Sequence, residues 1–256
     1  MSTRHDRRFL GVCGCVATMC LGPVTGPAWS QQTPVTVQVE VVRHNPAKRP
    51  AASANDNSNV VVWLQQVHDP GDRVGSANPR PSAKQPPQLV QHNKTFEPHV
   101  LVVEVGTLVQ FPNKDPFFHN VFSLFDGKRF DLGLYEGGSS STARFERPGM
   151  SFLFCNIHPE MSAIVVAVQT PYFGVSDRAG RLTIPNVPDG RYAMHVWYER
   201  STPEELKTLD RVIDIPESVR TLEPVKVTDT GDFSLTHKNK YGQDYPPQTT
   251  PAYKHP

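Results

Sequence analysis

Cysteine, histidine and methionine recur at three-residue steps in one short segment of the chain. Cys155, His158 and Met161 lie between two segments that have the composition of β-strands, and His119 directly precedes a third such segment. A thiolate, two imidazoles and a thioether are the donors of a mononuclear blue-copper site, in which methionine is a weak axial ligand. These four side chains therefore predict a type 1 copper centre.

The donor types also argue against other metal sites. Thioether sulfur is a poor zinc ligand, and structural zinc sites ordinarily take four Cys or His donors. The other cysteines, Cys13, Cys15 and Cys20, all lie within the first thirty residues. If that segment is removed, Cys155 is the one cysteine left, which excludes an internal disulfide and a two-copper centre that shares two thiolates.

The first thirty residues have the pattern of a cleaved signal peptide. Three arginines precede a short apolar or small-residue run at 9–21, and small residues stand at 28 and 30, where a signal peptidase reads the chain. We expect cleavage after Ser30 and a periplasmic or otherwise exported protein. The paired arginines resemble a twin-arginine signal, so both that route and general secretion stay open. A free thiol in an oxidising compartment needs burial or a metal, which gives Cys155 a reason to be present.

Composition restricts the remaining function classes. The 256 residues carry 26 Lys and Arg against 25 Asp and Glu, with no basic stripe for nucleic acid. No interval reaches the roughly 18 apolar residues of a membrane span, so we expect no integral membrane segment in the mature chain. The 25 prolines disfavour long helices and favour short strands joined by turns. The expected fold class is all-β.

Two groups of short apolar runs predict two small β-sandwiches. The first group is expected to form strands at 100–105, 108–111, 120–124, 142–146, 151–155 and 163–168. The second is expected to form strands at 172–175, 181–184, 191–199, 212–215 and 223–227, with a helix at 202–209. Two earlier runs, 35–41 and 60–64, either form an N-terminal extension or complete the second sandwich, and the apolar run before Leu64 favours the latter.

At these residues the segment 91–169 resembles cupredoxins of the plastocyanin, pseudoazurin and amicyanin group. The matching motifs are Phe111-Pro112-Asn113, Phe118-His119-Asn120-Val121, Phe154-Cys155, and the spacing Cys-x-x-His-x-x-Met of the short amicyanin loop. The resemblance implies a Greek-key β-sandwich that holds copper through His119, Cys155, His158 and Met161, with Asn120 linking the two ligand loops. The segment is also similar to exported bacterial proteins labelled methylamine-utilisation or plastocyanin-like.

One residue departs from the resemblance. Plastocyanin and amicyanin have proline two residues after the cysteine, where this chain has Ile157. The N–H of Ile157 is available for a second backbone hydrogen bond to the thiolate, beside one from Asn120. Because hydrogen bonds stabilise electron density on sulfur, we expect a higher reduction potential than with proline at this position.

The resemblance further implies that His158 is the port through which electrons leave. The apolar patch around it is expected to comprise Phe117, Phe118, Pro159 and Met161. The two phenylalanines fit equally well as packing at the end of the sandwich. The other histidines have no partner at ligand spacing, so we expect structural or solvated roles for His44, His68, His92, His99, His195, His237 and His255.

The unit at 172–199 resembles the transthyretin-like regulatory domain found beside carboxypeptidases. Its motifs are Gly174-Val175-x-Asp177-x-x-Gly180 and Pro188-x-Gly190-x-Tyr192, which are turn residues and include no catalytic group. The expected organisation is a signal peptide (1–30), N-terminal strands (31–69), a Pro-rich linker (70–88), a cupredoxin domain (89–170), a carboxypeptidase-regulatory-like sandwich (171–228) and a polar tail (229–256).

The sequence thus predicts an exported blue-copper protein that transfers single electrons to and from redox proteins of unnamed identity. It is not expected to be an enzyme, because no nucleophile triad, carboxylate pair or open metal position is evident. Two alternatives stay open. One is a copper-handling protein without a fast redox role, and the other is an adhesion or carbohydrate-binding β-sandwich with a vestigial copper loop.

Overall fold

The computed structural model describes residues 34–43, 56–67, 85–124, 127–230 and 237–245. The predicted signal peptide and residues 70–84 of the predicted linker lie outside these ranges. Strands dominate the described residues, and one short helix, α1 (Pro203–Leu209), accompanies them. The expectation of an all-β protein built from β-sandwiches is confirmed.

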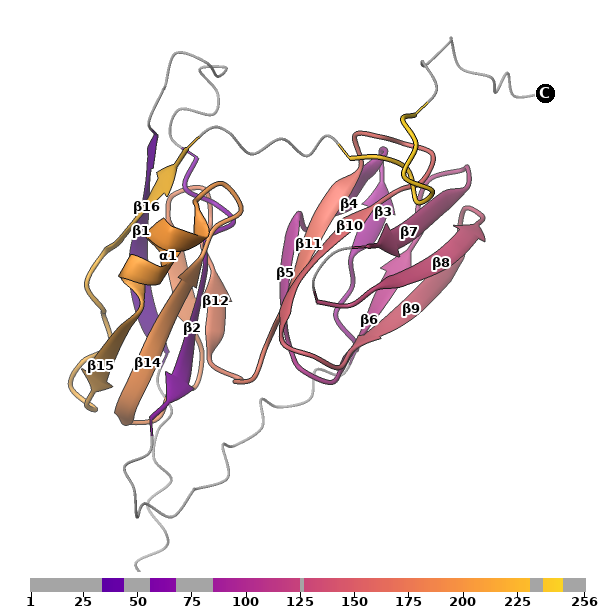
Figure 1. Cartoon of the computed structure of the whole chain (residues 1–256). Helices are drawn as coiled ribbons and strands as arrows, with labels where there is room; N and C mark the ends of the chain where they lie inside the picture. The colour runs from indigo at the N-terminus through magenta and orange to yellow at the C-terminus, as the bar shows by residue number, and fades with distance from the viewer. Residues whose placement is uncertain (1–33, 44–55, 68–84, 125–126, 231–236, 246–256) are drawn as a thin grey trace, which may run out of the picture. The chain divides into compact units, whose positions relative to one another are not determined.

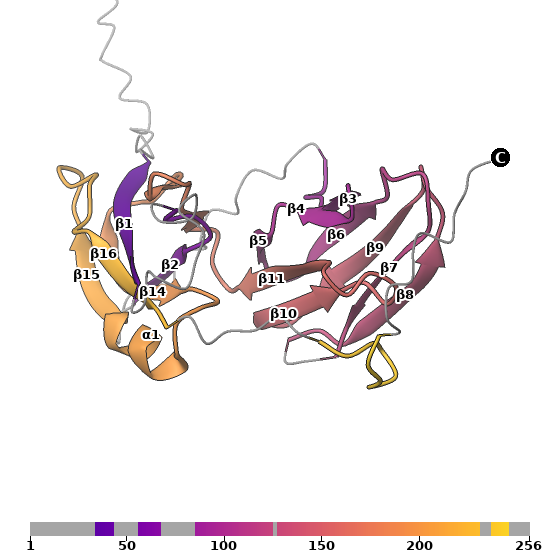
Figure 2. The same cartoon turned by 90° about the horizontal axis from the view of Figure 1, so that it is seen from above.

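The first sandwich contains the candidate donors. Its strands are β3 (Val90–His92), β4 (Thr95–Glu97), β5 (Val100–Glu104), β6 (Thr107–Pro112), β7 (His119–Ser123), β8 (Phe130–Tyr135), β9 (Ser140–Phe145), β10 (Gly149–Phe154) and β11 (Ser162–Val168). One sheet has the order β5-β11-β10-β7-β8, and the pairs β3-β4 and β6-β9 oppose it, as the view in Figure 2 shows. β10 lies between β11 and β7 and is antiparallel to both.

The sheets of this sandwich enclose one apolar core. Strands from both sheets contribute buried side chains to it, namely Val109 and Phe111 of β6, Phe145 of β9 and Leu153 of β10. All five residues of β7 are buried, polar ones included. The core continues to the end of the sheet where β10 stops and β7 starts, and it is at this end that polar and sulfur-containing side chains replace hydrocarbon.

The second sandwich is assembled from both ends of the chain. Its strands are β1 (Val35–Arg43), β2 (Val61–Gln66), β12 (Phe173–Val175), β13 (Arg181–Ile184), β14 (Gly190–Trp197), β15 (Arg211–Ile215) and β16 (Val225–Asp229). The sheets have the orders β13-β1-β16 and β12-β2-β14-β15 (Figure 1). Since β1 and β2 pair with strands that follow the first sandwich, β3–β11 form an insertion between β2 and β12.

Side-chain alternation explains why β1 belongs in this sandwich. Its four valines at odd positions from Val35 to Val41 are buried, while the residues between them are exposed. A strand with that period buries one face only, and Leu182 and Ile184 of the neighbouring β13 complete the apolar layer. β16 runs to Asp229, one residue beyond the predicted end of this unit.

No helix among the residues that the structure describes has the length and apolar character needed to cross a membrane.

Candidate metal centre

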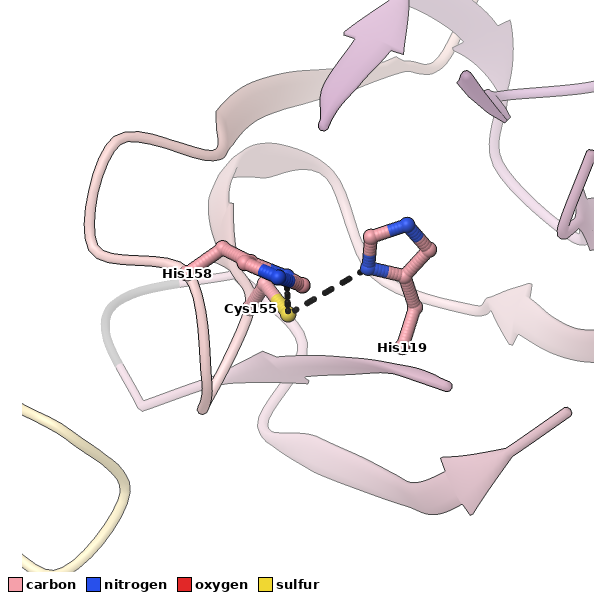
Figure 3. A group of neighbouring side chains, drawn as sticks. All are labelled: His119, Cys155 and His158. Carbon is pink, nitrogen blue, oxygen red and sulfur yellow. Dashed lines mark hydrogen bonds between the residues drawn. The ribbon is translucent and has the colours of Figure 1, made fainter. Parts of the chain in front are cut away.

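Three of the predicted donors meet at one end of the first sandwich. Cys155 follows β10 directly, His158 lies on the loop from β10 to β11, and His119 is the first residue of β7. His119 was expected on the loop before that strand, and it pairs with Tyr135 of β8 instead. Figure 3 shows the two imidazoles turned toward the sulfur of Cys155. The structure therefore brings donors from two separate segments to one point.

The distances among the donor atoms test whether a metal ion fits. Cys155 Sγ lies 3.6 Å from His158 Nδ1 and 3.8 Å from His119 Nδ1, and the three donor atoms lie within 4.8 Å of one another. A trigonal ion with metal–sulfur and metal–nitrogen bonds of about 2.3 and 2.0 Å would separate sulfur from nitrogen by about 3.7 Å. The two observed sulfur–nitrogen separations match that geometry, so the three side chains fit a common ion.

Met161 belongs to the same buried region. Its side chain is 0% exposed and lies in the core cluster that also contains Cys155. Its backbone N–H donates to the carbonyl of His158 at 3.1 Å, and its carbonyl accepts from the N–H of Cys155 at 3.3 Å. The tight loop therefore returns the backbone of Met161 to the side of the cysteine.

Asp115 determines which nitrogen of His119 is available. The carboxylate accepts from His119 Nε2 at 2.8 Å, and it also accepts from the backbone N–H groups of Asn93 and Lys94 at 2.7 and 3.0 Å. Burial would raise the pKa of Asp115, but the N–H groups of Lys94, His119 and Asn93 together lower it below its usual value. An ionised carboxylate only accepts hydrogen bonds, so Nε2 carries the proton and Nδ1 keeps its lone pair toward Cys155.

Burial governs the proton on Cys155. The side chain is 0% exposed, and burial raises the pKa of the thiol although backbone N–H groups of Ile157, Asn120 and His158 counteract it. The metal-free protein therefore holds a thiol at neutral pH, and binding of a metal would displace its proton. The same N–H groups then face a thiolate, to which they are stronger donors.

Asn120 and Ile157 were the two residues predicted to support the donors. The backbone N–H groups of both face Cys155 and act to lower the pKa of its thiol. The side chain of Asn120 donates to Asp131 Oδ1 at 2.7 Å and to the Gly133 carbonyl at 2.9 Å, both in β8. The link from Asn120 to the cysteine loop thus runs through its backbone, while its side chain anchors β7 to β8.

The predicted patch around His158 differs in one member. Phe117 contacts both imidazoles, with ring centroids 5.2 Å from His119 and 5.6 Å from His158, and Phe118 is 51% exposed. Pro159 is half-buried, whereas Met161 is fully buried because it faces the core, and it contributes nothing to the surface. Ile157, at 42% exposure, takes its place.

His158 itself is half-buried and its ring is neutral at physiological pH. Burial, with His119 and Lys94 nearby, lowers its pKa to about 4. A neutral imidazole offers the lone pair that a metal needs. Among the other histidines in the described part of the chain, His99 contacts the carbonyl of Ser162 and His195 pairs with Asp210, and neither belongs to the cluster of His119, Cys155 and His158.

Sequence reasoning missed Asp115. It stands four residues before His119 on an irregular segment, where no strand or helix period indicates which side chains meet. A carboxylate at that spacing is common on exposed loops, and only its burial and its two backbone donors distinguish it.

No protein-family model matches the chain, and no curated protein matches it. Similar solved structures include a purple cupredoxin from Nitrosopumilus maritimus, which is 24% identical over 32% of this chain and 99% of that chain, with a TM-score of 0.30. A reduced mutant of amicyanin is 21% identical over 34% of this chain and 85% of that one, with a TM-score of 0.32. A copper-containing nitrite reductase from Thermus scotoductus is 24% identical over 50% of this chain, at a TM-score of 0.32, and the match spans 28% of that enzyme.

Proposed function

We propose that this protein is an exported type 1 copper protein that carries single electrons in the periplasm. The observation that supports this most directly is the convergence of one thiol and two imidazole nitrogens at separations of 3.6 and 3.8 Å. A bound copper ion supplies a one-electron Cu(II)/Cu(I) couple at such a site. The sequence resemblance to exported plastocyanin-like and methylamine-utilisation proteins agrees with this assignment.

The surroundings of the donors suit electron transfer better than substrate chemistry. Cys155, His119 and Met161 are each 0% exposed, so they offer no surface at which a substrate could bind. His119 is held by Asp115, and Cys155 by three backbone N–H groups, so little has to move when the charge of the site changes. We infer that the chain is a carrier and not an enzyme, since a catalytic metal keeps an open position for substrate.

His158 is the donor that reaches the surface. Its half-buried ring lies beside Phe117, and Phe118 and Ile157 are exposed on the same end of the sandwich. An apolar surface around a ligand imidazole suits transient docking of a redox protein, because it desolvates easily and imposes no charge requirement. The second, carboxypeptidase-regulatory-like sandwich then serves as a spacer or docking surface.

The visible spectrum of the purified protein loaded with Cu(II) tests the proposal, with Cys155→Ser as the control. We expect an intense blue band that ascorbate bleaches, that air restores and that the serine variant lacks. Repeated cycling without loss of copper supports a carrier, whereas release of Cu(I) to a chelator at each reduction supports copper handling. A folded protein that stays colourless and retains no copper would instead favour a binding module with a vestigial loop.

A further inference from the structure

A short segment near the C-terminus folds into a compact turn of its own. In residues 237–245, which we call the C-terminal clasp, Asn239 Oδ1 accepts from the N–H groups of Tyr241 and Gln243 at 3.0 Å each. The N–H of Asn239 donates to the Gln243 carbonyl at 2.8 Å, and Gly242 adopts a left-handed φ of 76°. The clasp, drawn in yellow in Figure 1, is therefore ordered by its own sequence.

The clasp bonds directly to the ligand loop. The hydroxyl of Tyr245 donates to the backbone carbonyl of Cys155 at 2.7 Å. The backbone N–H of Lys240 donates to Asn156 Oδ1 at 2.9 Å. The carbonyl of the cysteine ligand and the side chain of the next residue are thus both held by one turn, 84 to 90 residues further along the chain.

The residue before the cysteine is covered as well. The imidazole of His237 stacks on the ring of Phe154, with centroids 4.0 Å apart and an interplanar angle of 29°. His237 Nδ1 also lies 3.2 Å from the Tyr245 hydroxyl. Burial lowers the pKa of His237, so the ring is neutral and stacks on Phe154 without the cost of a buried charge.

A second connection reaches the sulfur through β8. Lys240 Nζ donates to Asp131 Oδ2 at 2.7 Å, and the other oxygen of Asp131 accepts from Asn120 Nδ2 at 2.7 Å. Asn120 in turn contributes its backbone N–H to the Cys155 sulfur. The clasp therefore contacts the ligand loop directly and is linked to Asn120, on the other segment that faces the sulfur, through Asp131.

The ligand loop needs such support because it makes few backbone bonds of its own. Within 155–161 the backbone bonds are Cys155 N–H to the Met161 carbonyl, at 3.3 Å, and Met161 N–H to the His158 carbonyl. The carbonyl of Cys155 finds its partner in the clasp. A buried carbonyl without a donor costs free energy, so loss of that donor is expected to shift the peptide that carries the ligand.

We propose that the C-terminal clasp is part of the metal centre and that Tyr245 is a positioning residue for Cys155. This inference rests on the proposed function for its consequence at copper, although the contacts themselves exist in the metal-free chain. The hydroxyl of Tyr245 holds the Cys155 peptide, the Lys240 backbone holds Asn156, and together they keep the sulfur directed at the two imidazole nitrogens.

The test compares Tyr245→Phe with Tyr241→Phe in the full-length protein. Both substitutions remove one hydroxyl from the same turn, but Tyr241 is 71% exposed and its hydroxyl does not contact the ligand loop in the described structure. In the metal-free protein, the rate at which Cys155 reacts with Ellman's reagent should rise about fivefold in Tyr245→Phe, as expected for one lost hydrogen bond, and stay unchanged in Tyr241→Phe. Cys155→Ser supplies the background from other thiols.

A second readout follows the copper-loaded protein. Tyr245→Phe should shift the thiolate-to-copper band and the reduction potential, which a role in overall stability alone would not move, while Tyr241→Phe leaves both at the wild-type values. Equal thiol reaction rates and equal spectra in the two variants would overturn the proposal. If the wild type forms no blue site, the proposed function fails, and the thiol reaction in metal-free protein still decides whether the clasp positions Cys155.

Discussion

Ile157→Pro removes one N–H from the sulfur of Cys155 and leaves the other donors in place. In the copper-loaded wild type the thiolate would face the backbone N–H groups of Ile157, Asn120 and His158. Reduction of bound copper would add electron density to the metal–thiolate unit, and hydrogen bonds to sulfur would stabilise that density. Loss of one donor therefore favours the oxidised state, and the reduction potential of the variant should fall.

The size of the effect follows from the strength of one charge-assisted hydrogen bond. Such a bond contributes about 2 kcal/mol, and the couple senses only the part that differs between the two oxidation states. If that part is about half, the change of about 1 kcal/mol corresponds to about 40 mV for a one-electron couple, since a tenfold change in equilibrium constant is about 59 mV. We expect a potential lower by about this amount.

Cyclic voltammetry of the copper-loaded protein measures the difference, and Ile157→Ala is the matched control. The side chain of Ile157 is 42% exposed, so its truncation to alanine disturbs little packing and keeps the N–H. In the metal-free proteins, the pKa of the Cys155 thiol should also be higher in Ile157→Pro than in Ile157→Ala. A potential in Ile157→Pro equal to or higher than in Ile157→Ala would refute the assignment of this N–H as a donor to the thiolate.

Three further perturbations test the surroundings of the site and the second sandwich. Asp115→Ala removes the hydrogen-bond acceptor of His119 Nε2, so chelator competition should show a copper affinity reduced by about 10- to 100-fold. An unchanged affinity would show that Asp115 does not support the metal site. In metal-free protein, the pKa of His158 is about 4 in the folded state and about 6.5 in the unfolded state. The unfolded chain therefore takes up a proton first as the pH falls, so the urea midpoint should drop between about pH 6.5 and pH 4. His158→Gln should flatten this pH dependence, and an equally steep dependence in the variant would assign it elsewhere. Gly180→Ala forces a side chain into φ 77° with its Cβ 2.0 Å from the Val39 carbonyl, so calorimetry should show a loss of about 2 kcal/mol or more, and a loss near zero would contradict the turn geometry.

The strands were predictable where one face of each is apolar. The valines of β1 alternate strictly, and β13 was located at its observed residues because its two apolar residues lie two positions apart. β8 was missed because its half-buried and exposed residues do not alternate and because it contains Gly133, so neither its period nor its composition separates it from a loop. Pairing with β7, which no local pattern encodes, makes it a strand.

The donor residues were predictable from the sequence, whereas the residues that hold them in place were not. Cys155, His158 and Met161 are adjacent in sequence, and their types restrict the chemistry whatever the fold. Asp115 and Tyr245 act through contacts with residues on other segments, the second across 90 positions of the chain. Side chains of ordinary type acquire such roles only when the fold brings the segments together, so sequence spacing carries no signal for them.

The exposed fractions of the side chains around the proposed copper site indicate on which side a redox partner docks. On the side of the cysteine, His237 covers Phe154 and the Lys240 backbone holds Asn156, so the thiolate and its covalent neighbours are screened from a partner. On the other side, the ring of His158 lies next to exposed apolar residues. Because electron transfer weakens steeply with distance, we expect a redox partner that docks over His158 to exchange electrons faster than one that docks over the clasp. Charged substitutions at Phe118 should therefore slow exchange with a redox partner and leave the spectrum unchanged, while Tyr245→Phe should shift the spectrum and leave docking of the partner over His158 unchanged.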